Sequence, residues 1–420
     1  MVDWKKDIKL SDLVRRKKDA EPAAAPVEAR DEQEPKKSRF ARKAKAPKEQ
    51  KQKRQRAPRA GRPVSVPRRG KKIVGLKVGA SQLAAARVVN NGHPELLQLA
   101  REELEPGIVV GGELREPDAL AEALKTFFRA HKLPRNGVRL GIASNRIGVR
   151  TFEISDIADE KQLHNAIRFR AQEALPIPLD EAVIDYQVLS ERVDENGSRT
   201  RRVLLVVVYR DLVDRYVAAC RKAGVKLMGI DLEAFAALRA VGGADRQANA
   251  AVVVASVGHD RTTLAVSNGS VCEFTRIIEW GGQNLNVAIA RALDVAPSEA
   301  EPVKRTLSLL EPAEAWTGLA AEQAVRAREA LQRELETFSR ELISSLQFYQ
   351  GQPGSLGIGE IVLTGGTAHL PGLDVELGNL IGVRVNVGDP LARVRPGKRI
   401  SGDEQLGSLA VAIGLGIEEH

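Results

Sequence analysis

Three glycine-containing turns stand at the ends of strand-like segments and are the clearest candidates for chemistry. Two are hairpin turns, within residues 77–81 (KVGAS) and 256–263 (SVGHDRTT), and the third is the pair Gly365–Gly366 after an apolar strand. Glycine has no Cβ, so backbone N–H groups at such turns can approach a phosphate group closely. The same glycines can also serve only to turn the chain. The residues alone leave both interpretations open.

The chain lacks the sequence motifs of other common kinds of active site. The chain has no Gly-x4-Gly-Lys-Ser/Thr phosphate loop, no Gly-x-Ser-x-Gly nucleophile turn and no histidines at metal-ligand spacing. His259 falls in a hairpin turn, where we interpret it as a solvated turn residue. Asp231 and Glu233 stand at the start of a predicted helix, and we assign them to helix capping and to the helix dipole.

Charge is divided unevenly along the chain. Residues 1–72 hold 25 Lys and Arg against 10 Asp and Glu, a net charge of +15, whereas the remainder carries a net charge of −6. Such a segment cannot bury enough apolar surface to offset its ordering entropy, so we predict a disordered basic tail over 1–72. Its first eighteen residues include Trp4 and several aliphatic residues, which fit either a short docking motif or a frayed end.

Composition excludes several classes of protein. Apolar residues make up 43% of the 420 positions, enough for a large core, yet no apolar run approaches the ~20 residues that cross a bilayer. No secretory signal is visible at the N-terminus. The two cysteines, Cys220 and Cys272, fit a reducing compartment and cannot build a cysteine-rich metal site. We therefore expect a cytosolic protein of two or more domains.

Two α/β units position the glycine turns. Each unit is predicted to begin with three strands joined by turns, at 73–78, 83–89 and 95–104 in the first and at 250–254, 262–267 and 272–278 in the second. Between the units, an amphipathic helix, a hairpin and a further helix indicate a small inserted α+β module.

This doubled pattern resembles the actin, Hsp70 and sugar-kinase superfamily, in which two such units face one nucleotide. Within it, the chain resembles the PilM family of type IV pilus assembly proteins, which is close in fold to the cell-division protein FtsA. The resemblance covers about residues 72–418. Its most specific stretches are QEALPIPL at 172–179, IDYQVL at 184–189, GGQNL at 281–285, SLQFY at 345–349, LTGG at 363–366 and LPGL at 370–373.

The resemblance implies an α/β fold, namely an actin-like (ribonuclease H-like) two-domain ATPase fold with an inserted α+β subdomain of SHS2 type. The predicted organisation is a basic tail at 1–72, actin-like domain 1 at 73–151, the SHS2-like insertion at 152–232, actin-like domain 2 at 233–403, and a C-terminal helix at 404–420 that packs back on domain 1.

The resemblance also places a nucleotide between the two units, but the chain departs from the superfamily where Mg²⁺ is held. Lys77 and Ser256 stand where the two hairpins usually have Asp, and Asp260 stands where Gly is usual. Mg²⁺ needs oxygen ligands, so we expect no metal, no catalytic residue and no hydrolysis. ATP binding without hydrolysis stays open, with Lys77 as a phosphate contact. The candidate nucleotide-binding residues are Lys77, Gly79, Ser81, Gly258, Thr262, Thr263, Gly365, Gly366 and Thr367.

In function, the resemblance implies a cytoplasmic adaptor of a type IV pilus or type II secretion-like assembly machine, peripheral to the inner face of the membrane. Its partners would be other pilus assembly components and a PilN-like inner-membrane protein, whose cytosolic N-terminal peptide docks between the first unit and the insertion. That groove is expected near residues 138–143, 152–154 and 159–175, where Arg168 and Arg170 could meet acidic peptide groups.

Two alternatives come from other classes. The first is an active actin-like ATPase or small-molecule kinase, against which Lys77 and Ser256 argue. The second is a nucleic-acid-binding protein that works through the tail. Residues 36–72 hold 17 basic residues but a single aromatic, Phe40, so they offer no series of stacking platforms and no specific nucleic acid is expected. This segment would instead bind an anionic membrane surface.

Overall fold

The computed structural model describes residues 70–418, apart from 156, 158, 175–177, 195–197, 243–249, 270, 399 and 401–405. The basic tail predicted over 1–72 lies almost wholly outside the described residues, as does most of the hairpin turn predicted at 195–198. None of the helices in the described ranges is long and apolar enough to cross a membrane.

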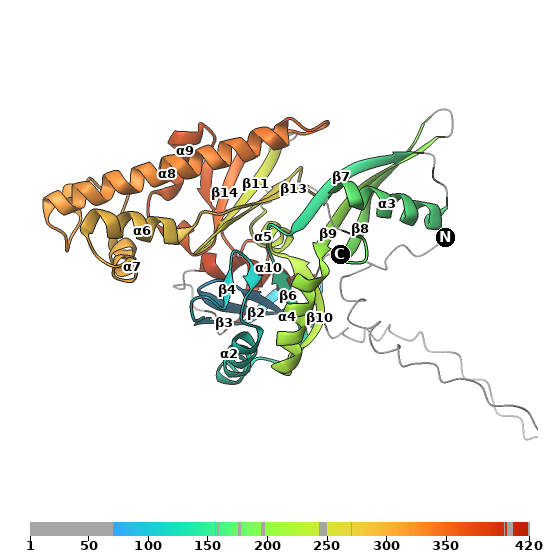
Figure 1. Ribbon diagram of the computed structural model, residues 1–420, viewed down its shortest axis with the longest axis horizontal. Coiled ribbons are helices and arrows are strands. Elements are labelled where there is room, and N and C mark those ends of the chain that lie inside the picture. The colour runs from blue at the N-terminus through green and yellow to red at the C-terminus, as the bar shows by residue number, and fades with distance from the viewer. Residues whose placement is uncertain are drawn as a thin grey trace, which may run out of the picture.

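The first unit is a six-stranded sheet in the order β10-β6-β1-β2-β3-β16, in which β1, β2 and β3 form an antiparallel meander and β6 and β10 run parallel to β1. The three strands predicted at 73–78, 83–89 and 95–104 are all present. The main elements are β1 (Lys71–Val78), β2 (Gln82–Asn90), β3 (Glu95–Glu103), α2 (Pro117–Ala130), β6 (Asn136–Ile142), α4 (Arg210–Lys222) and β10 (Lys226–Leu232). Helices α2 and α4 cover one face of this sheet with a shared apolar core (Figure 1).

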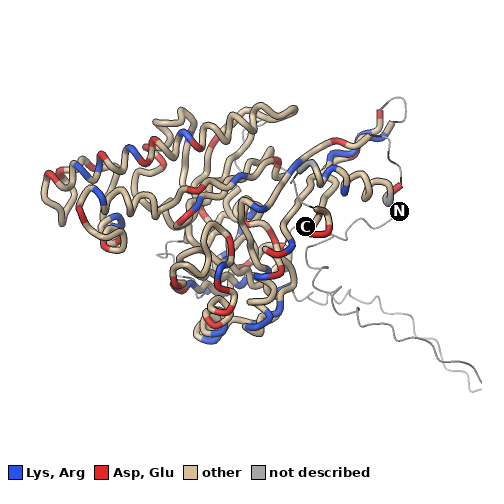
Figure 2. Tube along the Cα trace, in the orientation of Figure 1, with Lys and Arg blue, Asp and Glu red and all other residues tan. Residues whose placement is uncertain are grey.

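The second unit is a five-stranded sheet in the order β13-β12-β11-β14-β15, so β13 forms one edge. Its elements are β11 (Ala250–Val257), β12 (Thr262–Ser267), β13 (Cys272–Ile278), α6 (Gly282–Leu293), α7 (Pro297–Thr306), α8 (Ala321–Gln350), β14 (Gly357–Thr364), α9 (Leu373–Ile381) and β15 (Val385–Val387). The long helix α8 lies along the outside of the molecule, and basic and acidic residues are interspersed along it (Figures 1 and 2).

Two helices, α5 (Glu233–Val241) and α10 (Ala410–Gly416), pack together between the two sheets. Their backbones approach closely because glycine occupies the contact points. A Cβ added at Gly414 would lie 1.8 Å from the carbonyl oxygen of Ala236, and one at Gly75 would lie 2.0 Å from that of Ala412. Any side chain at these two positions would therefore force the layers apart.

The insertion between β6 and α4 is a three-stranded sheet in the order β7-β9-β8, covered on one face by α3. Its elements are β7 (Ile147–Ser155), α3 (Glu160–Ala174), β8 (Ala182–Val193) and β9 (Arg199–Tyr209). Strand β7 was not predicted, since Gly148 and two charged residues interrupt its alternation. The insertion is tied to the second unit by an ion pair between Arg202 on β9 and Glu273 on β13, at 2.6 Å.

Other differences from the sequence prediction concern the ends of helices. The sequence predicts a helix over 297–309, but α7 ends at Thr306, because Leu307 takes an extended conformation and the N–H of Leu309 donates to the carbonyl oxygen of Pro371. The segment of the predicted C-terminal helix that the structure describes is a 3-10 turn (Leu406–Leu409) followed by α10. Three short strand segments were also missed, namely β4 (Val109–Val110), β5 (Glu113–Leu114) and β16 (Arg395–Pro396).

The Arg202–Glu273 pair should contribute measurably to stability. Glu273 is 4% exposed and also accepts hydrogen bonds from Tyr349 and Asn268, while burial raises the pKa of Tyr349 to about 12 and keeps its hydroxyl protonated. Arg202→Met leaves this buried carboxylate without its cation, and we expect the free energy of unfolding in urea to fall by about 3 kcal/mol.

The matched control for that variant is Lys222→Met. Lys222 pairs with Asp118 at 2.8 Å, but both side chains are exposed to solvent, so the loss of stability should be much smaller than that of Arg202→Met. Equal losses in the two variants would contradict a structural role for the Arg202 pair.

Candidate functional site

A cleft of about 460 Å³ lies where the two sheets face each other at the predicted glycine turns. The turn between β1 and β2, the turn between β11 and β12 and the residues after β14 all contribute to its walls. Seven of the nine candidate nucleotide-binding residues line this cleft: Lys77, Gly79, Ser81, Gly258, Thr263, Gly366 and Thr367.

The other two candidates serve the surrounding structure. Thr262 is fully buried and its hydroxyl donates to the carbonyl oxygen of Trp280 at 2.8 Å. Gly365 has a φ of +95°, and a Cβ there would lie 2.2 Å from the carbonyl oxygen of Val257. Glycine is required at this position, because other residues rarely adopt this φ and a side chain would separate β14 from β11.

Lys77 faces a carboxylate inside the cleft. Its Nζ lies 3.7 Å from Oε2 of Glu233, and the two side chains are 12% and 3% exposed. Oε1 of Glu233 is buried without a hydrogen-bond partner among the described residues. The assignment of Glu233 to helix capping was therefore wrong, since α5 has no side-chain cap and Glu233 pairs with Lys77, but Glu233 does stand in the first turn of α5, as the predicted pairing with the helix dipole requires.

Asp231 also has another role than capping. Its carboxylate forms an ion pair with Arg239, which in turn donates to the carbonyl oxygen of Gly414 at the end of α10. The pair thus fastens β10 and α5 to α10, between the two sheets.

Asp260 joins the two units across the cleft. Its Oδ2 accepts a hydrogen bond of 2.9 Å from the backbone N–H of Gly111 in the first unit, and its Oδ1 lies 3.4 Å from the buried guanidinium of Arg261. Tyr216 holds the same turn of the first unit by donating its hydroxyl to the carbonyl oxygen of Gly112. The protein's own carboxylate therefore links the two units beside the cleft.

The remaining cleft groups balance one another in charge. Lys304 donates to the carbonyl oxygen of Gly282 at 3.0 Å, and burial lowers its pKa to about 8. Burial also lowers the pKa of His259, which is half-buried in the cleft wall and not a freely solvated turn residue. The charged lining residues are Lys77, Arg101, Arg261, Lys304 and Arg305 against Glu102, Glu103, Glu233, Asp260 and Glu301. Such a lining has no excess of positive charge to offer a polyphosphate.

Metal binding has no support in the described part of the chain, where no group of three or more His, Cys, Asp or Glu residues could hold an ion. Ser256 is 4% exposed, and Thr367 donates its hydroxyl to the carbonyl oxygen of Gly258. The side chains that would contact a nucleotide are thus largely engaged with one another.

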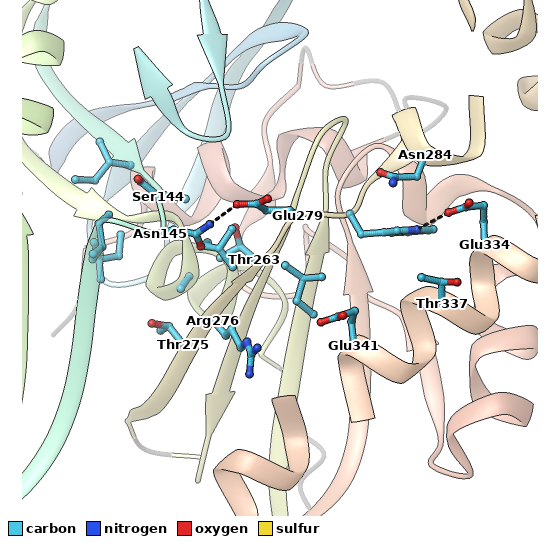
Figure 3. Close-up of a pocket in the computed structure, with 18 residues that line it drawn as sticks. Ser144, Asn145, Thr263, Thr275, Arg276, Glu279, Asn284, Glu334, Thr337 and Glu341 are labelled. Atoms are coloured by element: carbon cyan, nitrogen blue, oxygen red, sulfur yellow. Dashed lines mark hydrogen bonds between the residues drawn. The ribbon is translucent and has the colours of Figure 1, made fainter. Parts of the chain in front are cut away.

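A second cavity, which we call the junction groove, has a volume of about 750 Å³ and lies where the first unit, the insertion and the second unit meet. Its walls are the segment from β6 to β7, the start of α5, strand β13 with its following residues, and one face of α8. Figure 3 shows Ser144 and Asn145 on one side, and Glu334, Thr337 and Glu341 projecting from α8 on the other.

Acidic side chains predominate in the junction groove. Its charged lining residues are Glu279, Glu334 and Glu341 against Arg276. Glu279 accepts a hydrogen bond of 2.7 Å from Asn145, and Trp280 donates to Glu334 at 3.4 Å while its ring stacks on Phe338. Within the described chain, Glu341 forms no ion pair, so its carboxylate is available to a ligand.

The predicted partner groove corresponds to the junction groove only in part. Of residues 138–143, Ile142 and Ala143 line it, whereas 152–154 and α3 do not. Arg168 and Arg170 are exposed on α3 and line neither cavity. The acidic face of α8 was missed, although Glu334, Thr337 and Glu341 stand at i, i+3 and i+7 and so share one side of the helix.

Comparison with known proteins agrees with this architecture. A family model described as type IV pilus assembly protein PilM matches residues 75–420. The chain belongs to the PilM family. A solved structure of a PilM-PilN type IV pilus biogenesis complex is 25% identical, has a TM-score of 0.68, and is matched over 82% of this chain and 97% of its own.

Curated relatives of this PilM-family chain include the cell division protein FtsA of Bacillus subtilis, 26% identical over 50% of this chain and 48% of its own length. FtsA of Escherichia coli K12 is 26% identical over 57% and 62%. The chain thus spans about half to three fifths of these relatives. The actin-like α/β fold with its SHS2-type insertion is confirmed, while the residue boundaries of the domains stay predictions.

The pairing of Lys77 with Glu233 can be tested by stability. Lys77→Met leaves a carboxylate that is 3% exposed without its cation, and we expect the free energy of unfolding to fall by about 3 kcal/mol. Adding Glu233→Gln to this variant removes the unpaired buried charge and should restore most of the lost free energy of unfolding, as measured by urea denaturation. A double variant no more stable than Lys77→Met would show that the two groups do not interact.

Asp260 should weaken the binding of nucleotide phosphates. Asp260→Gly removes the carboxylate from the turn between β11 and β12. We expect the dissociation constant for ATP, measured by calorimetry, to fall about tenfold, which corresponds to about 1.4 kcal/mol of binding free energy. Asp260→Asn removes the charge but keeps an acceptor for Gly111, so it should give a similar change. Unchanged affinity in both variants would contradict the electrostatic interpretation.

Proposed function

We propose that this chain is a non-hydrolysing adaptor of a type IV pilus assembly machine. In this proposal it binds the cytosolic N-terminal peptide of a PilN-like inner-membrane protein in the junction groove. The observation that carries the proposal is the acidic groove along the edge strand β13. Membership of the PilM family and the likeness to a solved PilM-PilN complex support the assignment to this machine.

Charge favours this occupant of the groove. Cytosolic segments next to a membrane span carry an excess of Lys and Arg, according to the positive-inside rule. The groove presents three carboxylates and one guanidinium, so it attracts a basic peptide and disfavours an acidic one. Contacts of Arg168 and Arg170 with acidic peptide groups, as the sequence predicts, would need an acidic peptide instead.

Strand edges favour an extended peptide. Strand β13 is the edge of the second sheet and β7 is the edge of the insertion sheet, and the two lie near each other beside the groove. An exposed strand edge presents unpaired N–H and C=O groups to which an incoming peptide can add as a further strand. Backbone hydrogen bonds would then provide affinity, and side-chain contacts would provide specificity.

A preformed apolar wall favours a flexible ligand. A peptide that becomes ordered on binding loses conformational entropy, so it binds best where the pocket is already shaped. Trp280 is 3% exposed and held by its stack on Phe338, and the buried side chains of Ile142 and Leu232 also line the groove. These side chains give the groove a fixed apolar part beside its acidic wall.

Localisation follows from the partner in this proposal. The chain would be cytoplasmic and held at the inner face of the membrane by the PilN-like protein, with residues 36–72 adding contacts to anionic lipids. The cleft would act as a structural joint between the units, because Lys77 stands where a metal-binding carboxylate is usual and pairs with Glu233.

Peptide binding is tested with a charge reversal on α8. We expect Glu341→Lys to raise the dissociation constant of the partner's N-terminal peptide about tenfold, measured by calorimetry with the full chain. Glu336→Lys is the matched control, since Glu336 is exposed on the same helix but does not line the groove; its effect should stay within twofold. Equal effects of the two variants, or no binding in the millimolar range, would refute the groove.

Hydrolysis of ATP should stay at background. Neither hairpin has a carboxylate in the usual metal-holding position, so phosphate release should not depend on Mg²⁺. Glu233→Gln separates true turnover from contamination, because it alters a buried group of the cleft. Mg²⁺-dependent phosphate release that is lost in this variant would show that the chain is an ATPase.

A further inference from the structure

The junction groove carries acidic charge that the described chain does not neutralise. Glu279 is hydrogen-bonded to a neutral amide, Glu334 accepts only the weak contact from Trp280, and Glu341 has no ion pair among the described residues. Arg276 is the single cation in the lining. A ligand with several positive charges would therefore gain favourable interactions along the whole wall formed by α8.

The first eighteen residues of the same chain have the complementary composition. They hold seven Lys and Arg against three Asp. Trp4, Ile8 and Leu10 stand at even positions, so in an extended conformation their side chains share one face with Lys6, while Lys5, Asp7 and Lys9 project from the other. A segment of this pattern could add to the edge of β13 with apolar side chains on the groove floor and lysines near the carboxylates.

The connection is long enough for this docking. Fifty-one residues separate position 18 from position 70, and a flexible chain of this length spans about 40 Å on average. The eight residues of β1, which lead from position 71 toward the glycine turn, extend only about 27 Å. A tethered segment also has an effective concentration that can reach the millimolar range, so even weak docking would be populated.

We propose that residues 1–18 bind in the junction groove of their own chain and compete there with the partner's peptide. The competition rests on the proposed function, whereas the docking of residues 1–18 does not. The family model matches residues 75–420, so the tail lies outside the part of the chain that the model covers. The segment would act as an internal competitor that raises the concentration of partner needed for assembly.

The first measurement uses the tail alone as ligand. In the full chain, Trp4→Ala, Ile8→Ser and Leu10→Ser together should release the groove, and a synthetic peptide of residues 1–18 should then bind this triple variant. Adding Glu341→Lys should weaken that binding about tenfold, whereas adding Glu336→Lys should leave it within twofold. Absence of binding at millimolar peptide, or equal effects of the two reversals, overturns the docking.

The second measurement tests the competition. The partner's N-terminal peptide should bind the triple variant at least fivefold more tightly than the wild-type chain, and a control variant with Val64→Ser and Val66→Ser should match the wild type. Equal affinity for wild type and triple variant overturns the competition. If the 1–18 peptide binds through Glu341 while the partner's peptide binds neither protein, the proposed function fails and the docking of the tail stands.

Discussion

The close approach of α5 and α10 between the two sheets is the constraint on which the rest of the molecule depends. Glycine at positions 75 and 414 removes the side chains that would separate these layers. Buried Arg139 donates to the carbonyl oxygens of Leu415 and Ile417, and Arg239 donates to that of Gly414, so two cations satisfy the C-terminal end of α10. Because both sheets pack on this helix pair, their glycine turns face each other across one cleft.

The cleft that results is bridged by the protein itself. Lys77 and Glu233 neutralise each other at its base, and Asp260 links the second unit to the backbone of Gly111 in the first. In a nucleotide-binding relative of this fold, bound phosphates would occupy such a position between the walls. Here side chains provide the link, which is consistent with a scaffold whose ligand binds elsewhere, in the junction groove beside β13.

Most of the fold could be predicted from the sequence, because regular apolar spacing marks long elements such as α8 and the meander β1 to β3. The hairpins also show that Lys77 and Ser256 stand where the resemblance places metal-holding carboxylates, and the loss of hydrolysis that this implies stays a prediction. The Lys77–Glu233 pair was not, since 156 positions separate two residues that only the packing of β1 against α5 brings together. Strand β7 could not be predicted because Gly148 and two charged residues interrupt its alternation, and the groove beside it could not be predicted because its walls come from segments distant in the chain.

Hydrogen exchange of the full chain carrying Trp4→Ala, Ile8→Ser and Leu10→Ser, which free the groove of the tail, tests the central claim most directly when it is compared with and without the partner's N-terminal peptide. If the peptide adds to the open edge of the second sheet, amides of β13 (Cys272–Ile278) should exchange more slowly when it is bound, whereas those of the glycine turns in the cleft should not change. Slower exchange on α3 or in the cleft, with β13 unchanged, would contradict the account.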